Sequence, residues 1–180
     1  MLKRALLVTA IVLAGAAAGI ALHTASTEGD TLFSWKRPDN LGLQNGRLAP
    51  CKRTPNCVSS QADPADAEHY VAPISVKESA AEAIAALRRA LERMERVRVI
   101  REQPGYLYAE FRTRLLRYVD DVEFAFDEGA QVMHVRSASR LGRSDLGVNR
   151  KRVEAIRAML GGRSGSSWAG PLRAARASWP

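Results

Sequence analysis

The segment between Lys77 and Met94 places apolar residues at the spacing of a helix. They recur three and four positions apart, with charged residues on the opposite side: Ala80, Ile84, Leu87, Leu91 and Met94. Such a stripe predicts an amphipathic helix that buries one face. A second helical pattern begins after Ser144 or Asp145, either of which can cap it, and ends at 161–162, where two glycines follow one another.

Between these helices the pattern changes to the two-residue period of β-strands. We expect a strand over 97–100 and a turn into a strand over 106–113, and then a hairpin that joins 118–126 to 131–137. A short edge strand over 70–76 precedes the first helix. The sequence therefore predicts an α+β domain, with an antiparallel sheet of about four to five strands covered by two helices on one face.

The chain begins with a basic pair and an uncharged apolar stretch over 5–22. Its eighteen residues would span roughly 27 Å as a helix, so a cleaved signal peptide and a retained anchor both fit this N-terminal membrane-targeting helix. Basic residues precede the stretch and Glu28 and Asp30 follow it, which places the rest of the chain outside the cytoplasm. We expect an exported protein, periplasmic or anchored in the inner membrane and facing the periplasm.

Composition divides the chain into four parts. We expect a signal peptide or membrane anchor over 1–25, an extended lead-in over 26–44, the α+β domain over 45–160 and a disordered basic tail over 161–180. The lead-in has no clear period, but its scattered apolar residues need cover, and some of them can dock on the domain.

The net charge of +8 comes from 22 arginines, five lysines and 19 acidic residues. Codon bias alone can produce that arginine excess. Nucleic-acid binding is not expected, because the basic residues are scattered, no aromatic platform accompanies them and the chain is exported. No complete catalytic or metal-binding signature appears, and we expect no cofactor.

Two cysteines, Cys51 and Cys57, lie close together in the sequence. In an oxidising compartment such a pair favours a disulfide, with free thiols and a metal site as alternatives. A zinc site would need more ligands, and the three histidines have no recognisable metal spacing.

Strand parity singles out one carboxylate, Asp120. It shares the apolar face of its strand, whereas Asp121 and Glu123 point the other way. An unpaired buried charge is costly, so Asp120 should meet an arginine or backbone donors. Both a strand-end salt bridge and a carboxylate that orients an arginine toward a ligand fit this position.

The densest polar stretch, 136–154, lies where the last strand should end and the final helix should begin. A carboxylate or phosphate can bind there, because helix starts offer unpaired amides and arginine matches the geometry of such groups. The same arginines can instead bridge the protein's own acids. The ligand-binding residues that we predict are Arg136, Arg140, Arg143, Ser144, Asp145, Asn149 and Arg152, together with Asp120.

Two pieces of the chain, 55–61 and 136–150, resemble an uncharacterised family, domain of unknown function 1499. The matching residues are Pro55-Asn56-Cys57-Val58-Ser59-Ser60-Gln61 and Arg136-Ser137-Ala138-Ser139-Arg140, with Gly142, Ser144-Asp145, Gly147 and Asn149-Arg150. The resemblance covers roughly residues 45 to 160. It implies a small exported or membrane-tethered bacterial protein with plastid relatives and no established activity.

We therefore expect a non-catalytic envelope protein that binds an anionic small molecule, lipid headgroup or protein partner at the arginine-rich junction. Binding requires Arg140, Arg143 and Arg152 to converge on an open pocket. The alternative is a hydrolase-type enzyme that uses Asp120 with His134 or His69, or Ser59 or Ser60 as nucleophile. Catalysis requires a histidine within hydrogen-bonding reach of that carboxylate or of a serine, inside a concave site.

Overall fold

The computed structural model describes residues 36–114 and 117–161, and these form an antiparallel sheet and two helices. The elements in chain order are β1 (Cys57–Ser59), β2 (Ile74–Ser75), α2 (Ala80–Leu91), β3 (Val97–Gln103), β4 (Tyr106–Arg112), β5 (Val119–Asp127), β6 (Val132–Ser139) and α3 (Val148–Gly161). Strands β3 to β6 form a meander, and β1 and β2 both pair with β6. The predicted α+β class is confirmed.

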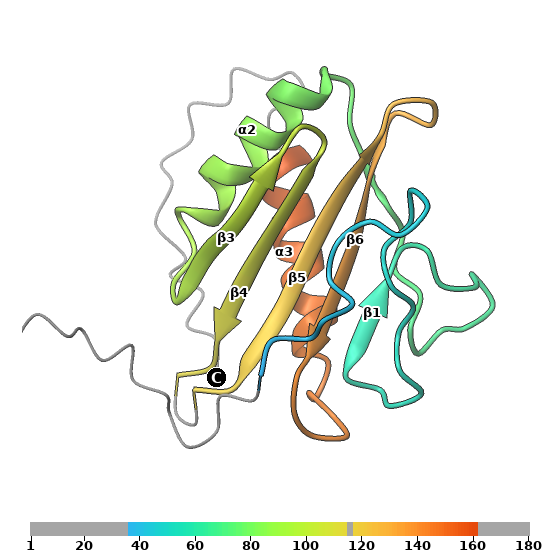
Figure 1. Ribbon diagram of the computed structural model, residues 1–180, viewed down its shortest axis with the longest axis vertical. Coiled ribbons are helices and arrows are strands. Elements are labelled where there is room, and N and C mark those ends of the chain that lie inside the picture. The colour runs from blue at the N-terminus through green and yellow to red at the C-terminus, as the bar shows by residue number, and fades with distance from the viewer. Residues whose placement is uncertain (1–35, 115–116, 162–180) are drawn as a thin grey trace, which may run out of the picture. The chain divides into compact units, whose positions relative to one another are not determined.

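Both helices lie on one face of the sheet, and the segment 36–50 crosses the other face (Figure 1). We call this segment the strap. The described part of the expected lead-in, 36–44, therefore packs on the sheet. No helix among the described residues is long and apolar enough to cross a membrane. The expected targeting segment over 1–25 and the tail from residue 162 onward lie outside the described residues.

The main core lies between the sheet and the helices. Alternate positions of β4, β5 and β6 supply its apolar side chains, as the two-residue period predicts. They pack against apolar residues from α2 and α3, and the buried members include Leu107, Phe111, Val122, Phe124, Met133, Val135, Leu87, Leu91, Val153 and Ile156. Each such large side chain contributes roughly 1.5–3 kcal/mol when fully buried.

Helix α2 begins with a capping box. The Ser79 hydroxyl accepts a hydrogen bond from the Glu82 amide, and the Glu82 carboxylate accepts one from the Ser79 amide. The helix ends at Leu91, earlier than the apolar stripe suggested, and the chain then turns before Arg96, which has a positive φ of 57°. Met94 still packs against the core from this turn.

Helix α3 begins with Asp145 as its capping side chain. The Asp145 carboxylate accepts hydrogen bonds from the amides of Gly147, at 2.9 Å, and Asn149, at 2.8 Å. Ser144, the other candidate, accepts a bond from the Leu146 amide instead. The cap is therefore occupied by the protein's own carboxylate.

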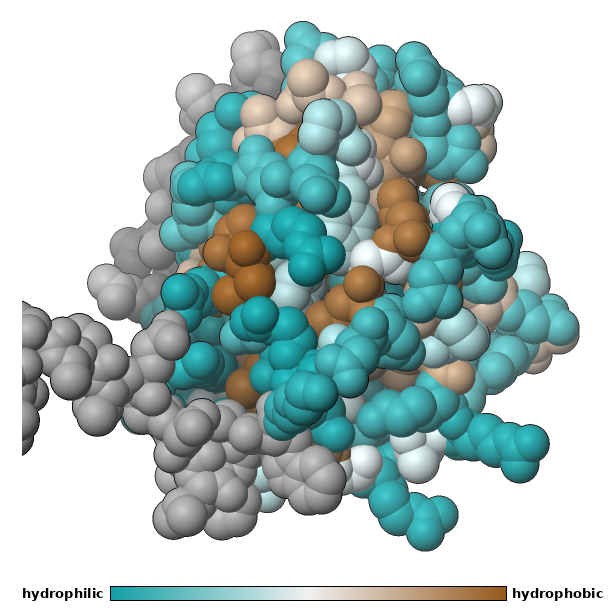
Figure 2. All heavy atoms as spheres, viewed as in Figure 1, coloured by the Kyte–Doolittle hydropathy of each residue, from teal (hydrophilic) through white to brown (hydrophobic). Residues whose placement is uncertain are grey.

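The strap covers a second, smaller apolar cluster on the opposite face of the sheet. Leu48 of the strap packs there with Tyr106, Tyr108 and Ala125. The Gly42 amide donates a hydrogen bond of 2.7 Å to the Glu123 carboxylate on β5. From outside, this side of the molecule is mostly hydrophilic, with small apolar patches (Figure 2).

Candidate functional site

A layer of ion pairs lies between the sheet and the strap. Glu110, Asp121, Glu123 and Arg136 are each at most 4% exposed and occupy the face opposite the helices. Arg140, just after β6, places Nη2 2.6 Å from Glu110 Oε1 and 2.7 Å from Asp121 Oδ1. We call these five residues the ionic layer. Its arginines bring positive charge between carboxylates that the strand register holds side by side.

Strap and strand residues complete the hydrogen bonds of these carboxylates. Arg37 of the strap lies 2.7 Å from Glu110. The Tyr108 hydroxyl donates to Asp121 at 2.6 Å, and the Tyr106 hydroxyl donates to Glu123 at 2.8 Å. Buried carboxylates can remain ionised when they accept such charge-assisted and hydroxyl hydrogen bonds.

The pKa shifts in this layer agree with its geometry. Burial acts to raise the pKa of Glu110, but hydrogen bonds from Arg37 and Arg140 outweigh it and hold that pKa below its usual value. Burial would lower the pKa of Arg140, yet Asp121 and then Glu110 raise it further above its already high value. Burial, reinforced by nearby carboxylates, also raises the pKa of Tyr106 and Tyr108. Glu110 and Arg140 are therefore charged, and the adjoining Tyr106 and Tyr108 are protonated donors.

A cleft of about 180 Å³ opens beside the ionic layer. Four basic residues line it, two from the strap side and two from the layer: Lys36, Lys52, Arg136 and Arg140. Asp121 is the one carboxylate among its lining residues. We call this space the Lys52 cleft, and its lining chemistry suits an anion.

Arg136 and Lys52 keep unused hydrogen-bonding capacity in this cleft. The Arg136 guanidinium has one hydrogen bond among the described residues, from Nη1 to Glu123 at 3.3 Å, and its buried Nε has no partner. The Lys52 ammonium donates to the Ser139 carbonyl at 3.2 Å and forms no ion pair within 36–114 and 117–161. Buried donors normally find acceptors, so Arg136 is an exception that calls for an explanation.

The charges around the cleft are also unbalanced. The three carboxylates of the ionic layer face four cationic side chains: Arg37, Arg136, Arg140 and Lys52. Lys36, which also lines the cleft, pairs with Asp39 of the strap at 3.2 Å. Arg112 also lies 3.9 Å from Glu110, so the cations outnumber the carboxylates and the surplus charge where the cleft opens is positive.

Three of the other predicted site residues, Asp120, Asn149 and Arg152, lie on the helix face in a separate buried network. Arg152 places Nη2 2.5 Å from Asp120, and its Nη1 donates to Asn149 and Ser137. The Arg152 guanidinium also lies 4.6 Å from the centre of the Phe111 ring. The expected partner of Asp120 is thus an arginine, and that arginine is committed to internal contacts.

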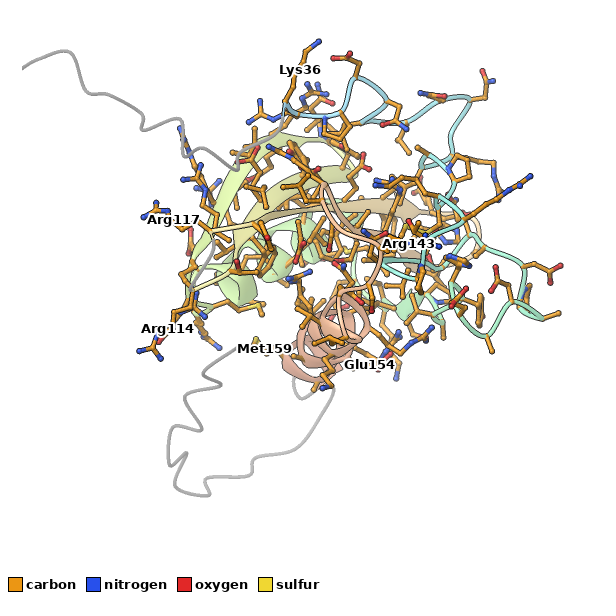
Figure 3. All side chains as sticks on the ribbon, turned by 90° about the horizontal axis from the view of Figure 1, so that it is seen from below. Lys36, Arg114, Arg117, Arg143, Glu154 and Met159 are labelled. Carbon is orange, nitrogen blue, oxygen red and sulfur yellow. A yellow bond between two sulfur atoms is a disulfide. The ribbon has the colours of Figure 1, made fainter. Side chains whose placement is uncertain are left out.

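The predicted convergence of Arg140, Arg143 and Arg152 on one pocket does not occur. Asp120 and Asp121 are neighbours on a strand and therefore point to opposite faces, and each binds its own arginine. Arg143 is exposed on the loop after β6 (Figure 3). Of the predicted binding residues, the structure brings Arg136 and Arg140 to an open cleft.

Asn56 links the cysteine loop to the loop after β6. The sequence did not predict this contact. Its side-chain amide donates to the carbonyls of Leu141 and Gly142, and its own carbonyl accepts from Asn149. Asn56 is fully buried. The sequence motifs around Asn56 and Asn149 thus meet in space and hold the junction together.

The sequence also did not predict Lys36 and Lys52 as site residues. Nothing in the irregular strap or in the cysteine loop that follows it indicated where these segments would pack. A partial signal was present. Strand parity placed Asp121 and Glu123 on one face, and two acids on a single face imply that something must cover or neutralise them. The register of the strands adds Arg136 to that face.

The residues of the hydrolase hypothesis are only partly brought together. His134 Nδ1 lies 3.1 Å from the Ser60 hydroxyl, while its Nε2 lies 3.8 Å from Asp127. Asp120 is remote from this pair, because it lies on the other face of the sheet. His69 pairs instead with Asp66 at 2.8 Å.

Two further features bear on the chemistry of the domain. A disulfide joins Cys51 and Cys57 with an S–S distance of 2.04 Å, which confirms the predicted bond. It fixes the chain immediately after the strap, next to Lys52. Within the described ranges, no group of three or more His, Cys, Asp or Glu side chains is arranged to hold a metal ion.

These observations define an α+β domain with an apolar core on one sheet face and a strap-covered layer of ion pairs on the other. The chain belongs to the family described as protein of unknown function DUF1499, whose profile matches residues 47–160. The resemblance expected from the motifs is therefore confirmed. No curated protein matches the chain.

Proposed function

We propose that this protein is a non-catalytic envelope protein that binds a small anion in the Lys52 cleft. The observation that carries the proposal is Arg136, a buried guanidinium with one long hydrogen bond to Glu123 and no partner for Nε. A bound carboxylate or phosphate would supply acceptors to its remaining N–H groups and to Lys52. It would also balance the surplus positive charge of the layer.

The size of the cleft favours a compact ligand. Its volume of about 180 Å³ is below the roughly 300–1,000 Å³ of most drug-sized ligand sites. A carboxylate, an inorganic phosphate or the headgroup of a larger molecule fits this volume. Arginine and lysine together favour phosphate, because the guanidinium offers paired donors and the ammonium adds a mobile charge.

An envelope location is supported by two features of the chain. The apolar stretch over 5–22 follows a basic pair, which is the pattern of a signal peptide or an anchor. The disulfide between Cys51 and Cys57 fits an oxidising compartment. We propose that the domain works outside the cytoplasm, in the periplasm or tethered to the inner membrane.

Titration calorimetry of the full chain with inorganic phosphate and with acetate tests the binding proposal. The variant Lys52→Gln removes an exposed cleft cation and leaves the ion pairs of the layer intact. We expect roughly tenfold or greater weakening of phosphate binding, the value of one charge-assisted hydrogen bond. The control Lys151→Gln makes the same charge change on the exposed side of α3 and should bind as the parent does. Absence of saturable binding by the parent would reject the site.

A hydrolase is the second candidate, favoured by the contact between Ser60 and His134. The Ser60 hydroxyl also accepts a hydrogen bond from the Val135 amide at 2.9 Å, which holds it against β6. A reactive serine would be labelled covalently by a fluorophosphonate, and Ser60→Ala would abolish the label. An unlabelled parent protein would leave this pair with a structural role.

A further inference from the structure

A second basic cleft lies at the end of the sheet where β4 leads toward β5. It has a volume of about 300 Å³. Five arginines from three neighbouring stretches of chain line it: Arg96, Arg98, Arg112, Arg114 and Arg117. We call it the arginine cleft. It shares no basic residue with the Lys52 cleft, so it is a separate site.

Positive charge exceeds negative charge in the arginine cleft. Glu110 is the one carboxylate among its lining residues, and Arg37 and Arg140 already bind that side chain. Arg112 lies 3.9 Å from the same carboxylate, the limit of an ion pair. Glu95 outside the cleft neutralises Arg96 at 2.8 Å. Among the lining residues, five guanidinium groups face one carboxylate, Glu110, so the lining carries a net positive charge.

Two of these arginines point away from the protein. Arg114 and Arg117 are exposed, and their side chains project outward from the same end of the molecule (Figure 3). Arg117 holds this position with a positive φ of 54°, a conformation that residues other than glycine seldom adopt. Their guanidinium groups are therefore presented to whatever approaches this end.

The described chain also begins beside this cleft. Arg37, the second described residue, bonds to Glu110 in the cleft lining. Fourteen residues separate Arg37 from the end of the apolar stretch over 5–22 (residues 23–36), a reach of at most roughly 50 Å. If that stretch is held in a bilayer, the chain leaves the bilayer and enters the domain next to the arginines.

We propose that the arginine cleft docks the domain on a bilayer of anionic phospholipids by binding their phosphate groups. Guanidinium groups match phosphate oxygens in pairs, and each basic residue near an anionic surface strengthens association by about fivefold. The proposal uses the membrane location proposed above but neither Lys52 nor Arg136. Failure of phosphate binding in the Lys52 cleft would leave it intact.

Arginine modification in the full chain, reconstituted in nanodiscs, tests the docking. Phenylglyoxal reacts with accessible guanidinium groups, and mass spectrometry gives the rate at each residue. We expect Arg114 and Arg117 to react several-fold more slowly in phosphatidylglycerol than in phosphatidylcholine nanodiscs, and the difference to shrink at high salt. Arg143, at a distance on the loop after β6, should react equally in both lipids (Figure 3).

Variants distinguish lipid binding in the arginine cleft from general attraction between a basic protein and an anionic surface. Arg112 lines the same cleft, so the parent should also protect it in phosphatidylglycerol nanodiscs. In Arg114→Gln with Arg117→Gln, Arg112 should lose this protection, because two of the arginines that bind phosphate are gone. The control pair, Arg143→Gln with Lys151→Gln, makes the same charge change at other exposed positions. It should keep the lipid-dependent protection of Arg112. Lys52→Gln should also keep the protection of Arg112, which distinguishes the arginine cleft from the Lys52 cleft. Equal rates at Arg114 and Arg117 in both lipids would overturn the proposal, and so would protection by an oligonucleotide but not by phosphatidylglycerol.

Discussion

Arg140 joins two strands through one nitrogen atom: its Nη2 contacts Glu110 on β4 and Asp121 on β5. These two carboxylates are direct register partners. Like charges opposite one another in a sheet repel, and the repulsion grows with burial. The guanidinium therefore offsets the repulsion between the two acids at the middle of the strap face.

Replacing Arg140 should lower the free energy of unfolding more than replacing any exposed arginine. In Arg140→Gln two buried carboxylates lose their shared partner, and we expect a loss of about 3–5 kcal/mol in the free energy of unfolding. Urea unfolding followed by circular dichroism measures this loss. Arg143→Gln, on an exposed loop, should change stability by no more than about 0.5 kcal/mol. Similar values for the two variants would mean that the ionic layer does not support the fold.

Glu110 should make the protein sensitive to acid. Its pKa is lowered in the folded state, so its contribution is present above the unfolded-state pKa of about 4.3. That contribution is lost as the pH falls through the lower folded-state pKa. Unfolding free energies measured from pH 7 downward should therefore fall more steeply for the parent than for Glu110→Gln. Parallel pH profiles would contradict the lowered pKa.

Asp120 and Arg152 should be coupled in stability. Asp120→Asn and Arg152→Met each leave a buried polar group without its charged partner, and we expect each to cost about 3–5 kcal/mol. The double variant should cost less than the sum of the two, because neither charge remains unpaired. A double-mutant cycle in urea gives the coupling energy. Strict additivity would mean that this bridge contributes nothing as a pair.

The disulfide should stabilise the domain by restricting the unfolded chain. It closes a loop between positions six apart in sequence, for which chain entropy gives about 2–3 kcal/mol. The double variant Cys51→Ser with Cys57→Ser should lose that amount in thermal or urea unfolding. Adding a reductant should destabilise the parent and leave the double variant unchanged. A parent insensitive to reductant while its thiols become reactive would refute this contribution.

Local periodicity predicted most of the fold because helices and hairpins are specified by neighbouring residues. Parity correctly separated Asp120 from Asp121 and Glu123. The boundaries of β3 were less predictable, because its pairing with β4 shifts register between Val99 and Arg101. The predicted edge strand over 70–76 is reduced to β2, and β1 in the cysteine motif pairs beside the other end of β6.

The site was harder to predict because it depends on long-range packing. Residues 136–154 look like one basic cluster in sequence, yet Arg140 turns to the strap face and Arg152 to the helix face. Arg152 pairs with Asp120, and Arg140 pairs with Asp121. Lys52 meets them only because the strap and the disulfide bring the cysteine loop over β6. No local pattern encodes that meeting.

The strap has a consequence for where this fold starts. The family match begins at residue 47, but Arg37 and the Gly42 amide already hold Glu110 and Glu123 in place. A chain trimmed to the family boundary would lose the strap contacts of Glu110 and Glu123 and the counter-charge of Arg37. The contacts that complete the ionic layer thus begin at least ten residues upstream of the match (37 to 46), in sequence that the shared profile does not include.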